Sequence, residues 1–443
     1  MKKTLFFAFL LFLLCVTCLA EGIDELEINS KAVYMVNLNN SQVMLSKNAE
    51  LEMEPASLTK IMTTLIVLEN CKDIENERIY ISDASLFNEI RREGGSNISL
   101  KQGETLTVKD LLYATMLPSA CDAAELLAYH FGDGDIDCFV DKMNARAQMI
   151  GAADTHFENA HGLSANGHTT TAYDMYLIAA EALKNETFRE IISSAAYTIP
   201  ATEVSAQRNI KYSVELVNKS SSNYYRYASG IKTGFTDQAG RCLITMATKD
   251  DASYLIVLMG ANLDGVSSPI KTFPDATTLF EYVFNAYSLV HLANSNEVIA
   301  HTELVFSEDN RKTLDILAEM DMELLLPHGV SPDMLQRDYK FYDNPELPIL
   351  KNDKVGTVTY SYDGKEIASF GLLSGTDIYD TLPENGNIVF YPAKGINRIS
   401  VYKMLLIAGV VLCIIGIVSL LRPKKSKRAV RRLPPARKRN INR

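Results

Sequence analysis

A serine and a lysine stand three positions apart in the otherwise apolar stretch PASLTKIMTT, residues 55–64. Residues three apart on a helix are neighbours, so a helix here would bring the Ser57 hydroxyl to the Lys60 amine. Pro55 suits a first helical turn, where the macrodipole and free N–H groups favour negative charge. A neutral lysine beside such a serine is a general base, and the serine becomes a nucleophile. The alternative is a chance match in which Lys60 reaches solvent.

Two further segments, which follow Ser57 along the chain, carry residues that could take part in catalysis by a serine nucleophile. Ser119 lies in a turn about 60 residues after Ser57, and the run Lys232-Thr233-Gly234 follows about 110 residues later. Ser-x-x-Lys, a serine-containing turn and Lys-Thr-Gly, in that order, are the active-site elements of penicillin-recognising serine acyltransferases. Three elements in order are far more specific than any one of them.

The chain closely resembles the D-alanyl-D-alanine carboxypeptidases among the low-molecular-mass penicillin-binding proteins. The resemblance begins near residue 28 and includes LTVKDLLYATMLPSACDAA, FENAHGLSANGHTTTAYDM and GIKTGFTDQAGRCL. It implies an α+β fold in which an antiparallel sheet is flanked by helices, with the active site between them. A small all-β sandwich domain would follow as a stalk to a C-terminal transmembrane helix.

Carried over residue by residue, the resemblance makes Ser57 the acylated nucleophile and Lys60 its base. Ser119 would pass a proton to the leaving amine. We also expect Lys232, as a nearby cation, to lower the pKa of Lys60 toward the neutral base. No metal or organic cofactor is implied.

The Lys-Thr-Gly segment would bind the substrate. By the same resemblance, Lys232 keeps the site positive and helps to orient the substrate carboxylate, and Thr233 hydrogen-bonds that carboxylate. Gly234 lets the substrate backbone approach the strand. The oxyanion hole would consist of the backbone N–H groups of Ser57 and Phe235.

One substrate-binding position departs from the family pattern. The third residue of the second motif is usually asparagine, and here it is Cys121. A thiol is a weak donor and acceptor, so the lost hydrogen bonds would cost about 1–3 kcal/mol, roughly a ten- to hundredfold rate loss. We expect Cys121 to pack as a small hydrophobe, with a reactive thiol as the alternative. His161 in AHGL is expected to buttress a turn.

Both ends of the chain suggest export. Residues 1–20 combine two lysines, an apolar stretch and small residues, which predicts a signal peptide. Residues 404–421 form an apolar run long enough for a membrane span, and residues 422–443 hold eleven Lys/Arg and no acid, which indicates a cytoplasmic tail. All 54 acidic residues lie between the two ends, so the exported part is strongly acidic and nucleic acid is excluded as its partner.

The region between the ends is predicted to hold a catalytic domain over residues 21–290 and an all-β domain over residues 291–398. A hairpin is expected around the Asn-Asn-Ser turn near residue 40, and Asp363-Gly364 predicts another hairpin. Helical patterns cover 57–70, 108–130 with a turn at Ser119, 137–150 and 171–184. Two strands are expected within 240–261, followed by a helix that ends near residue 288.

The resulting hypothesis is a membrane-anchored serine-type D-Ala-D-Ala carboxypeptidase outside the cytoplasmic membrane. It would remove the terminal D-alanine from peptidoglycan stem pentapeptides, and β-lactams would be covalent inhibitors. One alternative is a β-lactamase, although the sequence shows no glutamate in a clear second-base motif. The other is a catalytically weak penicillin-binding scaffold in which Cys121 marks lost activity.

Overall fold

A computed structural model of the 443-residue chain describes residues 23–261, 270–307, 310–342 and 347–379, with two short strands at 389–390 and 394–395. No helix in these segments has the length and apolar content that a membrane crossing needs. The predicted signal peptide, membrane span and basic tail lie outside the described residues and stay predictions.

The chain divides into two compact units. The first holds all described residues up to 296, together with 318–340 and 357–371. The second holds 297–317, 341–356 and the described residues from 372 onward. Every predicted site residue lies in the first unit. The boundary expected between residues 290 and 291 stays a prediction.

An antiparallel five-stranded sheet forms the centre of the first unit, in the order β2-β1-β9-β8-β7. All six residues of β1 are buried, because both faces of the sheet are covered. The expected hairpins at the Asn-Asn-Ser turn and within 240–261 are confirmed. The five strands are β1 (Ala32–Asn37), β2 (Val43–Lys47), β7 (Ala228–Thr236), β8 (Gly240–Lys249) and β9 (Ala252–Ala261).

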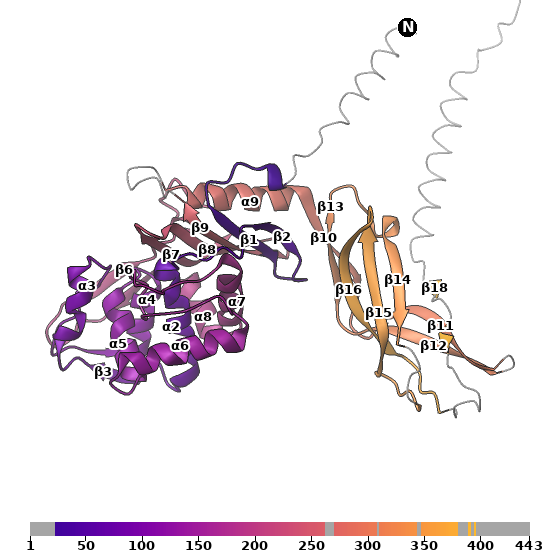
Figure 1. Ribbon diagram of the computed structural model, residues 1–443, viewed down its shortest axis with the longest axis horizontal. Coiled ribbons are helices and arrows are strands. Elements are labelled where there is room, and N and C mark those ends of the chain that lie inside the picture. Colours follow the sequence, from indigo (N-terminus) through magenta and orange to yellow (C-terminus); the bar gives the residue numbers. More distant parts are fainter. Residues whose placement is uncertain are drawn as a thin grey trace, which may run out of the picture. The chain divides into compact units, whose positions relative to one another are not determined.

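Helices cover both faces of this sheet. The long helix α9 (Thr272–Ala286) lies along one face, and the other helices gather on the opposite face (Figure 1). They are α2 (Lys60–Asn70), α3 (Asn88–Arg92), α4 (Val108–Met116), α5 (Cys121–Phe131), α6 (Ile136–Ile150), α7 (Ala172–Ala182) and α8 (Glu186–Ser193). Short 3-10 turns lie at Ile23–Glu25, Ala56–Thr59, Ala84–Phe87, Glu215–Val217 and Pro332–Met334.

The turn between α4 and α5 is where the sequence predicted it. Thr107 caps α4 through a capping box with Asp110, which fixes where the helix begins. Pro118 cannot continue the helix, and Ser119 takes a left-handed backbone with φ +65°. The chain re-enters a helix at Cys121, so Ser119 and Cys121 are both presented at this break.

The remaining strands form small two-stranded sheets and a C-terminal all-β region. Asp363 and Gly364 both have positive φ, as a two-residue hairpin turn requires, so the predicted hairpin is confirmed. The larger sheet has the order β14-β15-β16-β12-β11-β17, with β18 also on β11, and β10 pairs with β13. This region is an all-β sheet domain as expected, while its arrangement as a sandwich stays a prediction. Its strands are β10 (Tyr287–Ala293), β11 (Val298–Ser307), β12 (Asn310–Ala318), β13 (Met322–Pro327), β14 (Gln336–Phe341), β15 (Lys354–Tyr362), β16 (Lys365–Ser374), β17 (Val389–Phe390) and β18 (Lys394–Gly395). The small two-stranded sheets are β3 (Arg78–Tyr80) with β4 (Thr105–Thr107) and β5 (Ala196–Ile199) with β6 (Arg208–Lys211).

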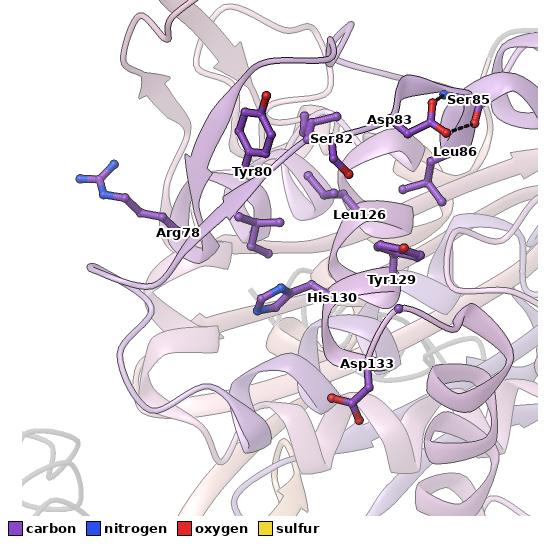
Figure 2. Close-up of a pocket in the computed structure, with 13 residues that line it drawn as sticks. Arg78, Tyr80, Ser82, Asp83, Ser85, Leu86, Leu126, Tyr129, His130 and Asp133 are labelled. Carbon is purple, nitrogen blue, oxygen red and sulfur yellow. Dashed lines mark hydrogen bonds between the residues drawn. The ribbon is translucent and has the colours of Figure 1, made fainter.

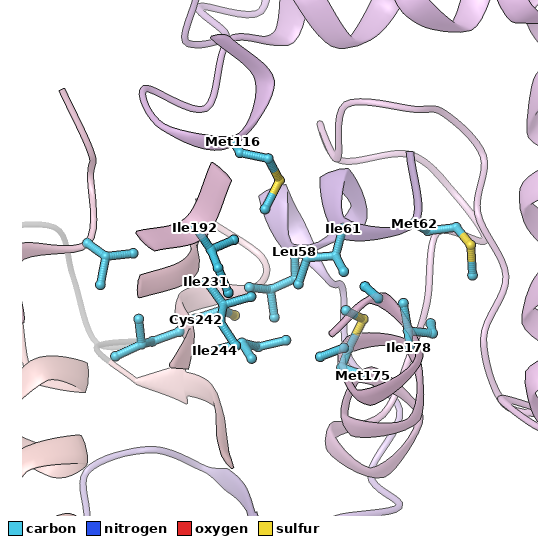
Figure 3. Packing of buried hydrophobic residues seen from close by; sticks show 14 of the residues in the cluster. Leu58, Ile61, Met62, Met116, Met175, Ile178, Ile192, Ile231, Cys242 and Ile244 are labelled. Atoms are coloured by element: carbon cyan, nitrogen blue, oxygen red, sulfur yellow. The ribbon is translucent and has the colours of Figure 1, made fainter. Parts of the chain in front are cut away.

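The hydrophobic core reaches the residues next to the predicted nucleophile. Leu58 and Ile61 are fully buried, and they lie among Met175 of α7 and Ile231 and Ile244 of the sheet (Figure 3). Ser57 therefore stands on a turn whose neighbouring side chain is fixed in the core. Tight packing of this kind holds a side chain to one position.

Replacing Leu58 with alanine should lower the free energy of unfolding by about 2–5 kcal/mol, because it leaves a cavity between the 3-10 turn Ala56–Thr59 and the sheet. The matched control is Leu51→Ala, at a leucine that is 37% exposed, which should change it by less than about 0.5 kcal/mol. Chemical denaturation followed by circular dichroism measures both. Equal losses in the two variants would contradict the packing described for Leu58.

Candidate active site

The Lys60 amine has three close neighbours. Its Nζ lies 2.9 Å from Ser57 Oγ, 3.3 Å from Cys121 Sγ and 2.5 Å from the backbone oxygen of His161. A neutral amine has two N–H groups and one lone pair. It can donate to His161 and Cys121 while its lone pair accepts the hydroxyl proton of Ser57. The arrangement is that of a general base in contact with its nucleophile.

Burial sets the charge state of the two site lysines. Lys60 and Lys232 are both inaccessible to solvent, and burial is the main cause that lowers the pKa of each. The repulsion between them lowers the pKa of Lys232 further. The expectation that Lys232 is what depresses the pKa of Lys60 was therefore wrong in its cause, since burial does so. Two adjacent buried ammonium ions at neutral pH are disfavoured.

The backbone before the nucleophile is held in an unusual conformation. Ala56 has φ +47°, which is rare for a residue with a side chain. Thr59 Oγ1 donates to the Ala56 oxygen at 2.8 Å, and His168 Nε2 lies 2.8 Å from the same hydroxyl. His168 Nδ1 accepts the N–H of Glu158, so Nε2 carries the ring proton and donates to Thr59. This chain of hydrogen bonds fixes the turn that presents Ser57.

A glycine from another segment packs closely against this turn. Gly162 has φ +78°, and a Cβ built there would lie 2.0 Å from the Ala56 oxygen and 3.0 Å from Ser57 N. Only a glycine permits both the backbone angle and the contact. The segment that supplies the His161 carbonyl to Lys60 therefore also packs directly against the nucleophile.

Ser119 has the free hydroxyl of the site. It is buried, it lines the same pocket as Ser57, and its Oγ has no hydrogen-bond partner among the described residues. A buried hydroxyl without a partner costs about 1–3 kcal/mol. A bound substrate that offers an acceptor or donor would relieve this cost, which fits a proton-transfer role.

The Lys-Thr-Gly run lies inside β7. Lys232 Nζ donates to the Thr233 oxygen at 3.0 Å, and Thr233 Oγ1 lies 2.7 Å from Ser213 Oγ. A Cβ at Gly234 would lie 3.1 Å from Ser57 N, so this strand edge packs against the nucleophile turn. Side chains alternate along the strand, which buries Lys232 and leaves Thr233 toward the pocket.

These elements enclose a pocket of about 610 Å³, here called the Ser57 pocket. Six of the eight predicted site residues line it, while the other two, Lys60 and Lys232, are buried and do not line it. Those that line it are Ser57, Ser119, Cys121, Thr233, Gly234 and Phe235. Among the described residues no cluster of His, Cys, Asp and Glu is suited to hold a metal ion.

Arg241 is a pocket residue that the sequence reasoning missed. It lines the Ser57 pocket, and its guanidinium lies 4.1 Å from the ring centre of Phe235. Arginine stays charged at any physiological pH, so it supplies the positive charge that a buried lysine lacks. The β7–β8 hairpin could have pointed to Arg241 in the sequence, because Arg241 pairs with Phe235, the residue after Lys-Thr-Gly.

Comparison with known proteins identifies the family. Residues 20–263, more than half of the chain, match the family described as D-alanyl-D-alanine carboxypeptidase, peptidase S11. The chain belongs to this family. Residues 287–380 match the C-terminal domain of penicillin-binding protein 5.

Individual relatives extend over most of the chain. The D-alanyl-D-alanine carboxypeptidase DacF of Bacillus subtilis is 29% identical over 80% of this chain and 87% of its own length, and DacA of Escherichia coli is 26% identical over 82% and 87%. Penicillin-binding protein 5 of Haemophilus influenzae superposes with a TM-score of 0.66 at 25% identity, over 80% of this chain and 99% of that one. The Streptomyces K15 DD-transpeptidase superposes with a TM-score of 0.53 at 28% identity, over 58% of this chain and 98% of that one.

A separate cavity of about 550 Å³ lies on the same unit of this family member. Tyr80, Tyr129 and His130 are among the side chains around it, and Arg78 extends away from it (Figure 2). None of the predicted site residues lines this cavity. Helix α5 begins at the Ser57 pocket with Cys121 and reaches this second cavity near its C-terminal end.

Replacing Gly162 with alanine should slow acylation of Ser57 by about a hundredfold or more, because the added Cβ displaces the nucleophile turn. The rate of labelling by a fluorescent penicillin measures this.

The matched control is Gly329→Ala, at a glycine with φ +89° and open space around its Cβ position. That variant carries the backbone strain without the clash, so it should lose about 1 kcal/mol of stability and keep its labelling rate. A Gly162→Ala protein that labels at the parental rate would contradict the close approach.

Proposed function

We propose that the chain acts as a serine-type D-alanyl-D-alanine carboxypeptidase whose acyl-enzyme forms on Ser57. The observation that carries the proposal is the Lys60 amine, which is inaccessible to solvent and lies 2.9 Å from Ser57 Oγ. The substrate would be a peptidoglycan stem pentapeptide ending in D-Ala-D-Ala. The product is a tetrapeptide and free D-alanine.

Acylation begins with proton transfer from Ser57 to Lys60. As the hydroxyl loses its proton, Oγ attacks the carbonyl carbon of the penultimate D-alanine and forms a tetrahedral intermediate. The N–H groups of Ser57 and Phe235 would receive its oxyanion. The C–N bond then breaks, the leaving amine takes a proton by way of Ser119, and D-alanine departs.

Deacylation uses the same groups with water as nucleophile. Lys60 accepts a proton from the water as its oxygen attacks the ester carbonyl, and the collapse returns that proton to Ser57 Oγ. The released carboxyl group belongs to the shortened peptide. A β-lactam carbonyl would acylate the same serine, and its adduct would deacylate slowly because the leaving group stays attached.

The terminal carboxylate of the substrate needs a cation, and Arg241 offers it. Thr233 and Ser213 present hydroxyls at the same wall of the pocket. A guanidinium with a neighbouring hydroxyl matches a carboxylate better than the buried amine of Lys232 does. We therefore reassign carboxylate binding from Lys232 to Arg241, with Thr233 in the role first expected.

The membrane placement is a proposal that rests on sequence. The apolar run 404–421 would anchor the protein, the catalytic unit would lie outside, and the basic tail 422–443 would stay in the cytoplasm. The signal peptide 1–20 would start export. The acidic exported part is consistent with action on the cell wall and not on nucleic acid.

Neither alternative from the sequence gains support. A β-lactamase would need a second base for fast deacylation, and no carboxylate is hydrogen-bonded to Ser57 or Lys60 among the described residues. A weak scaffold would follow from the loss of the usual asparagine. Cys121 instead places its sulfur 3.3 Å from Lys60, so the lysine keeps a partner at that position.

The direct test follows D-alanine released from a pentapeptide by the full-length protein in detergent. The parent should release it, and Ser57→Ala should fall by at least about 10⁴-fold because it has no nucleophile. A penicillin should label the parent only, at Ser57, by mass spectrometry. Release by Ser57→Ala at the parental rate would refute the mechanism.

Replacing Arg241 with glutamine should lower kcat/KM for the pentapeptide about ten- to hundredfold, mainly through KM, because a charged hydrogen bond to the carboxylate is lost. A substrate ending in an amide should not distinguish the two proteins. Arg226→Gln is the matched control, since Arg226 also stacks on a tyrosine, at 4.9 Å, and does not line the pocket. An equal loss for acid and amide substrates would refute the assignment.

A further inference from the structure

A buried carboxyl group lies one helical turn behind the active-site thiol. Glu125 follows Cys121 by four residues on α5, so both side chains leave the same face of the helix. The Glu125 side chain is 13% exposed, and its Oε2 has no hydrogen-bond partner among the described residues. Buried carboxyl groups normally have partners, so the group nearest to this oxygen is informative.

That group is the imidazole of His161, whose Nε2 lies 3.7 Å from Glu125 Oε2. His161 Nδ1 accepts the N–H of Leu163 at 3.2 Å, so the proton of the neutral ring is on Nε2 and faces Glu125. Burial lowers the pKa of His161 to about 3, which keeps the ring neutral. Burial, with the charge of Glu89, raises the pKa of Glu125 to about 7. The carboxyl group is therefore the member of the pair that changes charge near neutrality.

The same histidine holds the general base. Its backbone oxygen accepts a hydrogen bond from Lys60 Nζ, and its N–H and that of Gly162 both donate to Asn159 Oδ1 at 3.2 and 2.7 Å. Both N–H groups are held by one amide oxygen, which constrains the backbone that joins the His161 ring to its carbonyl. A force on the His161 ring changes the direction in which the Lys60 amine is held.

We propose that Glu125 is a positioning residue for acylation: its carboxylate accepts the Nε2–H of His161 and fixes the carbonyl that aims Lys60 at Ser57. The proposal rests on the acyl-enzyme described above. A hydrogen bond to an ionised acceptor is shorter than the present 3.7 Å, at about 2.7–2.9 Å, so ionisation of Glu125 draws the ring toward α5. Ionisation of Glu125 therefore raises the acylation rate, because it fixes the His161 carbonyl that orients Lys60.

The other titratable groups near Glu125 and His161 do not compete for the hydrogen bond between them. Lys60 on α2 and His168 both disfavour a charged His161, and burial lowers the pKa of His168 to about 4. Asp122 on α5 directs its carboxylate to the N–H groups of Ile98, Leu100 and Ala123, away from the pair. Glu89 on α3 opposes ionisation of Glu125. His161 is thus the donor available to an ionised Glu125.

The test compares the parent with Glu125→Gln, which has the same shape and cannot ionise. The full-length protein in detergent is labelled with a fluorescent penicillin between pH 5.5 and 9. The parental acylation rate should rise with a limb near pH 7. Glu125→Gln should lack this limb and stay about tenfold slower above pH 8, with an unchanged half-saturating concentration.

Glu89→Gln is the second variant, on an exposed side chain, and it should move the limb to lower pH with the same plateau. A merely structural role for Glu125 would slow Glu125→Gln equally at every pH. That result, or identical profiles for parent and Glu125→Gln, would overturn the proposal.

A readout independent of acylation separates this proposal from the proposed function. In the Ser57→Ala background, the ring ¹⁵N shifts of His161 should change with a midpoint near pH 7 and should not change once Glu125→Gln is added. Shifts that are flat in both proteins would overturn the positioning role and leave the Ser57 chemistry standing.

Discussion

The Lys60 amine is removed from water, and the rest of the site depends on that burial. Transferring an ammonium ion into a protein interior costs several kcal/mol, so the neutral form is favoured. A neutral amine has a lone pair for the Ser57 proton and two N–H groups for His161 and Cys121. The base is produced by packing, and its described hydrogen-bond partners include no carboxylate.

Such packing requires close approach of three segments, and glycines permit it. The strand edge at Gly234 and the loop at Gly162 both contact the backbone of Ser57. The nucleophile turn is further constrained by the left-handed Ala56, and the Ser119 hydroxyl has no partner within the described chain. Each such feature costs about 1–3 kcal/mol, and the surrounding core stabilises them. Local rules are broken here because the site must be formed before substrate arrives.

The sequence predicted what local patterns determine. Ser57 and Lys60 are three residues apart, and the hairpin at Asp363-Gly364 follows from its turn residues, so both could be foreseen. The order of the three motifs indicated the family, and the family resemblance predicted the antiparallel sheet and its helices. The site residues that could not be predicted from sequence depend on which strands and helices pack against one another. Arg241 reaches the pocket through strand register, whereas Glu125 has its role only because α5 packs against the His161 loop.

The charge states of the site lysines were also not predictable from the sequence. From sequence, Lys232 was predicted to act as a cation that lowers the pKa of Lys60, because its burial could not be known. In the structure both amines are buried, and the accessible positive charge of the pocket belongs to Arg241. The most direct test of this account is the pKa of Lys60, measured from the ¹³Cε shift of that lysine in the full-length protein and assigned with Lys60→Arg. A midpoint below the usual 10.5 is predicted, and an ordinary lysine pKa in an active protein would contradict the account.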